Sequence, residues 1–190
     1  MEPIVSAEEP AAARSSTSTF AAALALVVGA IVLLWFAPGS YEIYLALHVV
    51  AIVIWVGGDI TLTTLGIVFE RRRDGETLAA LGKMGAWIGV HVYTPALFAA
   101  FAFGVALVEK GNLGWTTLWL DLGLAGWAIA AIIGVGFVGP ELGRIDRAAQ
   151  QLGPESEEVQ RRVRRLFTIF RFDTALLILI VLDMTAKPSL

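Results

Sequence analysis

Five long apolar runs separate the charged residues of this 190-residue chain, and they constrain its fold more than any other feature. Each run is close to the roughly 20 apolar residues that a membrane-spanning helix requires. The runs cover residues 20–37, 41–69, 84–108, 118–138 and 166–186. With 57% hydrophobic residues, 16% charged residues and a mean hydropathy of +0.73, the chain is more apolar than a soluble core requires. We therefore expect an all-α integral membrane bundle of five transmembrane helices.

The runs are unbroken rather than alternating, which favours helices that satisfy their own backbone hydrogen bonds in lipid over a barrel. We expect a flexible cytoplasmic N-tail over residues 1–19 and an extra transmembrane helix over 20–38. A four-helix membrane domain is expected to follow over 41–188. The longest loop, residues 139–165, is expected to be a solvated connector. The alternative is a short surface helix, because Glu155, Glu157 and Glu158 precede four arginines at spacings near four.

Basic residues concentrate in alternate loops. Arg71, Arg72 and Arg73 follow the second run, and six arginines lie between the fourth and fifth runs, whereas the two other loops contain only Lys110. The positive-inside rule then places both basic loops in the cytoplasm, with the N-terminus inside and the C-terminus outside a cytoplasmic (inner) membrane. Basic residues this close to membrane ends point to lipid headgroups, and they argue against nucleic acid as a partner.

Four ionisable residues share one depth in the expected bilayer. At ~1.5 Å per residue, Asp59, His91, Arg171 and Asp173 lie roughly 5 to 8 Å to the cytoplasmic side of their run midpoints. Such a layer is either a structural ion cluster or a proton relay through Asp59 and His91. If the layer is neutralised by Arg171, Arg171→Ala should destabilise the protein far more than Arg162→Ala.

A second polar layer lies ~10 Å to the outer side of the midpoints and contains His48, Asp121 and Asp183. One imidazole and two carboxylates suit a hard or borderline divalent metal, and the alternative is a hydrated polar rim. The chain contains no cysteine, which excludes thiolate-bound metals, iron–sulfur clusters and c-type haem attachment.

The two histidines differ in depth by roughly 18 Å on the helical rise, so they cannot both ligate one haem iron. A single axial ligand from His48 remains open. The alternative is a hydrogen-bonded structural histidine.

The stretch from Leu47 to Gly58, LHVVAIVIWVGG, resembles a helix with His, Trp and Gly-Gly that several membrane protein families share. These are CopD-type copper-resistance proteins, HemJ-type protoporphyrinogen oxidases and, most similar, a related family of predicted integral membrane proteins without assigned function. Further similarity covers Phe137–Pro140, Arg171–Asp173 and Asp183–Pro188. The resemblance to HemJ-type proteins implies that His48 ligates haem b. It implies no role for other residues, and the methionine pairs typical of copper handling are missing.

Two functions follow as alternatives. The first is a haem b-binding or metal-binding redox module, in which Trp55 packs beside His48 and the inner charged layer passes protons. The second is a noncatalytic subunit of a larger membrane complex or of a homo-oligomer. Gly57 and Gly58 have a simpler interpretation in either case, because small residues let helices approach closely in lipid.

Overall fold

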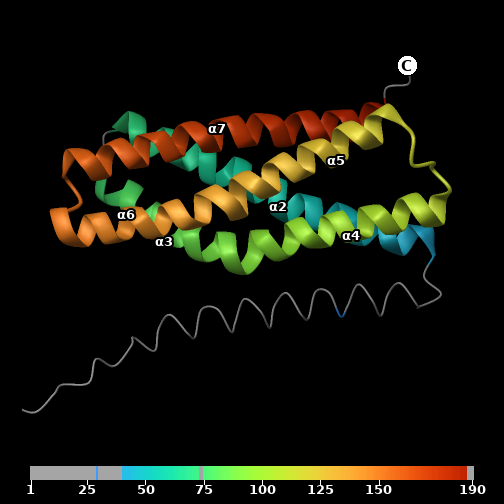
Figure 1. Cartoon of the computed structure of the whole chain (residues 1–190), viewed down its shortest axis with the longest axis horizontal. Helices are drawn as coiled ribbons and strands as arrows, with labels where there is room; N and C mark the ends of the chain where they lie inside the picture. Colours follow the sequence, from blue (N-terminus) through green and yellow to red (C-terminus); the bar gives the residue numbers. More distant parts are fainter. Residues whose placement is uncertain (1–28, 30–39, 73–74, 188–190) are drawn as a thin grey trace, which may run out of the picture.

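The structure, a computed structural model, describes residue 29 and the ranges 40–72 and 75–187. The expected N-tail and first helix therefore lie outside the described residues, apart from Gly29, which is helical. Every described element is a helix (Figure 1), as the all-α expectation required. In chain order they are α2 (Tyr41–Arg72), α3 (Gly75–Ile88), η1 (Gly89–Tyr93), α4 (Thr94–Gly111), α5 (Leu118–Ala131), η2 (Ile132–Val138), α6 (Gly139–Leu152) and α7 (Glu157–Ala186).

These elements form four long rods, because α3, η1 and α4 follow one another without a break, as do α5, η2 and α6. Three rods are long and apolar enough to cross a membrane, over Tyr41–Arg72, Ala80–Gly111 and Leu118–Leu152. The fourth rod, α7, does not meet that description, because Arg171, Asp173 and Asp183 interrupt its apolar run. The described part thus supplies three candidate spans where the sequence predicted four.

The two π-helical segments, η1 and η2, each end just before a proline. Pro95 is the second residue of α4 and Pro140 is the second residue of α6. Proline lacks an N–H and clashes with the carbonyl four residues earlier, so the α-helical pattern cannot pass through it unchanged. Instead the preceding residues bond five positions back: the N–H of Thr94 donates to Gly89 and that of Gly139 to Gly134. In each of these two rods, the π-helical segment lies near the middle.

The segment 139–165 is helical rather than the solvated connector that we expected. Residues 139–152 form α6, and α7 already begins at Glu157, so only a short turn separates them. Gly153 in this turn has φ of +84°, a conformation that favours glycine. The carboxylate of Glu141, which is only 5% exposed, accepts hydrogen bonds from Arg144 at 3.1 Å and from Arg162 at 2.8 Å. This ion pair joins α6 to α7.

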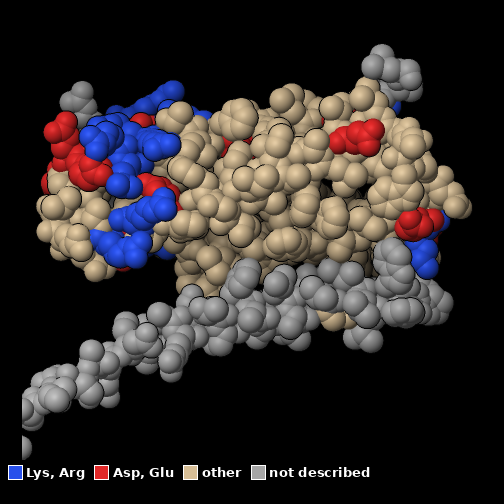
Figure 2. Space-filling model, in the orientation of Figure 1, with Lys and Arg blue, Asp and Glu red and all other residues tan. Residues whose placement is uncertain are grey.

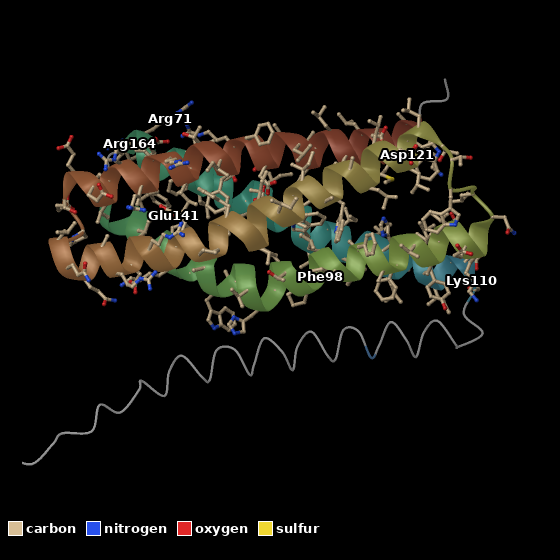
Figure 3. All side chains as sticks on the ribbon, in the orientation of Figure 1. Arg71, Phe98, Lys110, Asp121, Glu141 and Arg164 are labelled. Carbon is tan, nitrogen blue, oxygen red and sulfur yellow. The ribbon has the colours of Figure 1, made fainter. Side chains whose placement is uncertain are left out.

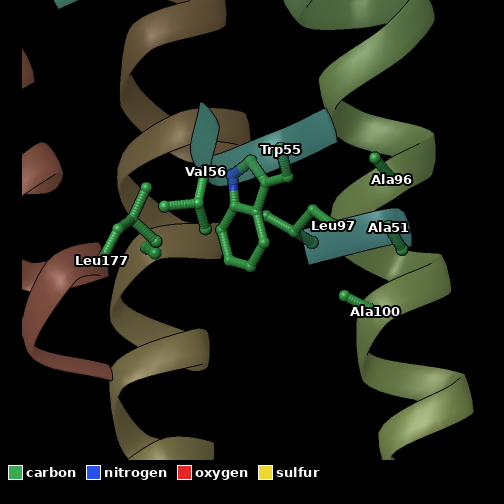
Figure 4. Close-up of a cluster of buried hydrophobic side chains, with 8 residues drawn as sticks. Ala51, Trp55, Val56, Ala96, Leu97, Ala100 and Leu177 are labelled. Carbon is green, nitrogen blue, oxygen red and sulfur yellow. The ribbon is translucent and has the colours of Figure 1, made fainter. Parts of the chain in front are cut away.

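The main hydrophobic core lies between α2, α4, α5 and α7. Figure 4 shows the Trp55 ring between Leu97 of α4 on one side and Leu177 of α7 on the other. Small residues complete the cluster, so that the helices approach closely around this one large ring: Ala51, Ala96, Ala100 and Ala130. The indole of Trp127 also donates a 3.1 Å hydrogen bond to the carbonyl of Leu97, which ties α5 to α4.

Charged side chains lie mainly at the two ends of the bundle. In Figure 2 basic and acidic residues cover one end, and the middle of this face is almost free of them. Figure 3 places Arg71, Glu141 and Arg164 at that end and Lys110 and Asp121 at the other. The separation of charge along the long axis is the pattern that a bilayer-embedded bundle requires.

Candidate functional site

His48 has a fixed orientation between α2 and α4. Its Nδ1 atom lies 2.8 Å from the carbonyl oxygen of Ala100. A carbonyl only accepts, so Nδ1 carries the proton and donates it, and the lone pair is left on Nε2. Gly104, one turn beyond Ala100, faces the same Nδ1–Cε1 edge of the ring: a Cβ atom there would lie 3.2 Å from Cε1 and 3.4 Å from Nδ1 of His48. Small residues of α4 therefore hold an imidazole whose free nitrogen can ligate a metal.

Trp55 lies two helical turns below His48 on α2 and is 7% exposed. It belongs to the same core cluster as Ala100, the residue whose carbonyl holds His48. Trp55 therefore supports the α2–α4 contact that fixes the histidine. Trp55 is a part of the core.

The predicted metal ligands of the outer layer do not come together. Asp121 is exposed at the start of α5, near the end of the bundle that Lys110 marks (Figure 3). Asp183 of α7 has a buried Oδ2 atom without a hydrogen-bond partner. Within the described ranges, no three His, Cys, Asp or Glu residues are grouped so as to hold a metal ion. His48 therefore belongs to no group of three such residues within those ranges.

A second polar site lies between α2 and α7. The hydroxyl of Thr174 donates a 2.5 Å hydrogen bond to Oδ2 of Asp59, which is 8% exposed. The oxygens of Thr174 and Thr63 are 2.9 Å apart. Because the single proton of Thr174 goes to Asp59, Thr63 must donate in this second contact. The hydroxyl of Thr63 thus donates to Thr174, and the hydroxyl of Thr174 donates to the buried carboxylate of Asp59.

Asp173 adds a second carboxyl group to this site. It is 7% exposed, and its Oδ1 atom is buried with no hydrogen-bond partner among the described residues. Thr174, the next residue in the chain, contacts Asp59, so Asp173 lies within one residue of this contact. That these two aspartates form one layer stays a prediction.

The other two members of the expected layer point elsewhere. Arg171 lies two residues before Asp173, which turns its side chain to another face of α7, where it forms an ion pair with Glu70 of α2. The Nδ1 atom of His91 donates to the carbonyl of Trp87 at 2.9 Å, and its ring stacks on Trp87 with centroids 4.7 Å apart. In the described part of the chain, neither side chain forms an ion pair with the aspartates, so Arg171 does not neutralise them.

Tyr93, the last residue of η1 in the second rod, lies against Gly58, the residue before Asp59. A Cβ atom on Gly58 would lie 2.3 Å from the Tyr93 ring, so only glycine leaves room for it. Gly57, in contrast, is exposed, and a Cβ atom there would meet nothing within 4 Å. The expected packing role therefore belongs to Gly58 alone.

Sequence reasoning did not identify Thr63, Thr174, Tyr93, Glu70 or Glu141. One signal was available: Thr63 follows Asp59 by four residues and so shares its helix face. The direction of Tyr93 could not be read from a regular helical period, because the π-helix η1 breaks it.

Comparison with known proteins agrees with this architecture. A family model described as "Predicted integral membrane protein (DUF2269)" matches residues 42–188, which is the expected four-helix domain. No curated protein and no solved structure matches the chain, so neither a CopD-type nor a HemJ-type relative was found. The match covers most of the chain and begins just before His48. The protein therefore belongs to the DUF2269 family of predicted integral membrane proteins.

Proposed function

We propose that this membrane protein is a haem b-binding redox module in which His48 is the axial ligand. The observation that carries the proposal is the hydrogen bond from Nδ1 of His48 to Ala100. Histidines that bind metals usually donate their other ring N–H to a backbone carbonyl or a carboxylate, which fixes the ring and raises the basicity of the ligating nitrogen. The resemblance of residues 47–58 to the HemJ-type helix points to the same residue.

The residues around His48 favour haem over a metal ion bound by protein side chains alone. A protein metal site needs several ligands, and the described residues group no three suitable side chains. Haem supplies four nitrogen ligands itself and requires only an axial residue. Haem b would supply one-electron chemistry, while Ala100 and Gly104 orient the imidazole and the core around Trp55 excludes water.

We also infer that the bundle crosses a cytoplasmic membrane with five spans, the N-terminus inside and the C-terminus outside. Two features support α7 as a span. It packs on both α2 and α5, and its outward face carries exposed apolar side chains, including Phe172, Leu179 and Leu182. The arginines of α6 and of the start of α7 mark the cytoplasmic end.

Haemin titration of the detergent-purified protein tests the proposal. The wild type should develop a Soret band that saturates, and His48→Ala should not. His91→Ala is the matched control, because His91 also donates Nδ1 to a carbonyl, but within its own helix. A Soret band that survives in His48→Ala and disappears in His91→Ala would overturn the assignment. A wild type that binds no haem would favour the noncatalytic subunit.

A further inference from the structure

We propose that Asp173 binds a proton inside the helical bundle and holds it as a neutral carboxylic acid beside the carboxylate of Asp59. The site is separate from His48 and does not depend on haem binding. Two carboxyl groups on facing helices form it, together with the hydroxyl chain from Thr63 through Thr174.

The surroundings of Asp173 favour the neutral form. Its side chain lies among core residues of α7, it is more than nine-tenths buried, and its Oδ1 atom has no donor within the described residues. An ionised carboxylate in such a place loses hydration, and its Oδ1 atom accepts no hydrogen bond from the described residues in exchange. Binding one proton from water forms an O–H bond and removes the charge.

Asp59 is the better site for the remaining negative charge. Its Oδ2 atom accepts the hydroxyl proton of Thr174, and the hydroxyl of Thr63 in turn supports Thr174. A hydrogen bond of this kind stabilises the ionised form of a carboxyl group. Two ionised carboxylates close together in an apolar bundle repel each other, so the charge on Asp59 strengthens the hold of Asp173 on its proton.

Among the ion pairs of the described residues, none includes Asp59 or Asp173. Tyr93 of η1 is a neutral phenol. Arg171 is paired with Glu70, and His91 is bound to its own helix. The remaining groups lie elsewhere: Lys83 is exposed on α3, Glu109 and Lys110 end α4, Asp121 begins α5, Glu141 of α6 is bound by arginines, and Asp183 is ten residues further along α7. A proton is therefore what balances the second carboxylate.

Infrared difference spectroscopy of the full chain in lipid nanodiscs, titrated from acid to alkaline pH, tests the proposal. The wild type should show the C=O stretch of a buried protonated carboxylic acid at neutral pH, with the expected shift in deuterated water. Asp173→Asn should abolish this band. Asp59→Asn should keep the band but shift its loss to lower pH, because the neighbouring charge is gone. Asp121→Asn, the exposed control, should change neither.

Several results would overturn the proposal. They are a wild type without the band at neutral pH, a band that persists in Asp173→Asn, and a band in Asp59→Asn that titrates as in the wild type. Circular dichroism checks that the variants fold. Asparagine has nearly the shape of the neutral acid, so Asp173→Asn should retain the wild-type melting temperature at neutral pH. A large loss of stability in this variant would also contradict a neutral Asp173.

Discussion

The ring of Tyr93 lies directly over Gly58, in the space that any larger residue at position 58 would occupy. This contact is made by the last residue of the π-helix η1 and the residue before Asp59. The π-helical segment η1 thus brings the second rod into contact with α2 next to Asp59. It also shows why helix packing at this site depends on one glycine.

Gly58→Ala should destabilise the protein by about 1 to 3 kcal/mol, the usual cost of adding a methyl group to a filled contact. The new Cβ atom would meet the Tyr93 ring at 2.3 Å and force it to move. Gly57→Ala is the matched control and should be nearly neutral, because its Cβ atom meets nothing within 4 Å. Thermal melts in detergent measure both, and adding Tyr93→Leu to Gly58→Ala should recover part of the loss. Equal melts for the two glycine variants would contradict this packing.

Gly104→Val should weaken haem binding while leaving the helical content intact. The Cβ atom alone would lie 3.2 Å from Cε1 of His48, and the valine methyl groups would push the ring away from the Ala100 carbonyl. The expected result is a higher dissociation constant in the haemin titration. Gly82→Val provides the control, since position 82 is open. Unchanged affinity in Gly104→Val would show that this face of the ring is not constrained.

Arg162→Ala should lower the melting temperature clearly more than Arg171→Ala. Arg162 bonds Glu158 at 2.7 Å and the buried Glu141 at 2.8 Å, and these two carboxylates hold its pKa above the ordinary value. Its loss would leave Glu141 with Arg144 alone. The pair between Arg171 and Glu70 is partly exposed, and such surface pairs contribute about 0 to 1 kcal/mol.

From the depth of Arg171 in the sequence, we expected Arg171→Ala to be more destabilising than Arg162→Ala. The ion pairs of the structure predict the opposite order. Helical rise gives the depth of a residue but not the direction of its side chain, and Arg171 points to another face of α7. A melting temperature that falls more in Arg171→Ala than in Arg162→Ala would support the original hypothesis that Arg171 neutralises the charged layer. Matched helical content of the two variants, measured by circular dichroism, is the control.

Hydropathy alone predicted the helical class and the position of the first described span, since the run 41–69 lies within α2. That Asp59 and Asp173 share one depth stays a prediction from the helical rise. The helix α6 was not predicted, because it is amphipathic and charged and resembles a loop in composition. The first turns of α7 fall where the charge spacing offered a short surface helix as the alternative. The contact between His48 and Ala100 spans 52 positions, and no local pattern in the sequence encodes it.

Chemical rescue tests whether His48 ligates haem through Nε2. His48→Gly removes the imidazole and leaves space beside Gly104 where free imidazole can bind. When this variant is purified in detergent and mixed with haemin, it should lack the Soret band of axial ligation. Adding imidazole should restore the band. A wild-type spectrum without imidazole, or a folded variant that imidazole does not restore, would contradict the claim.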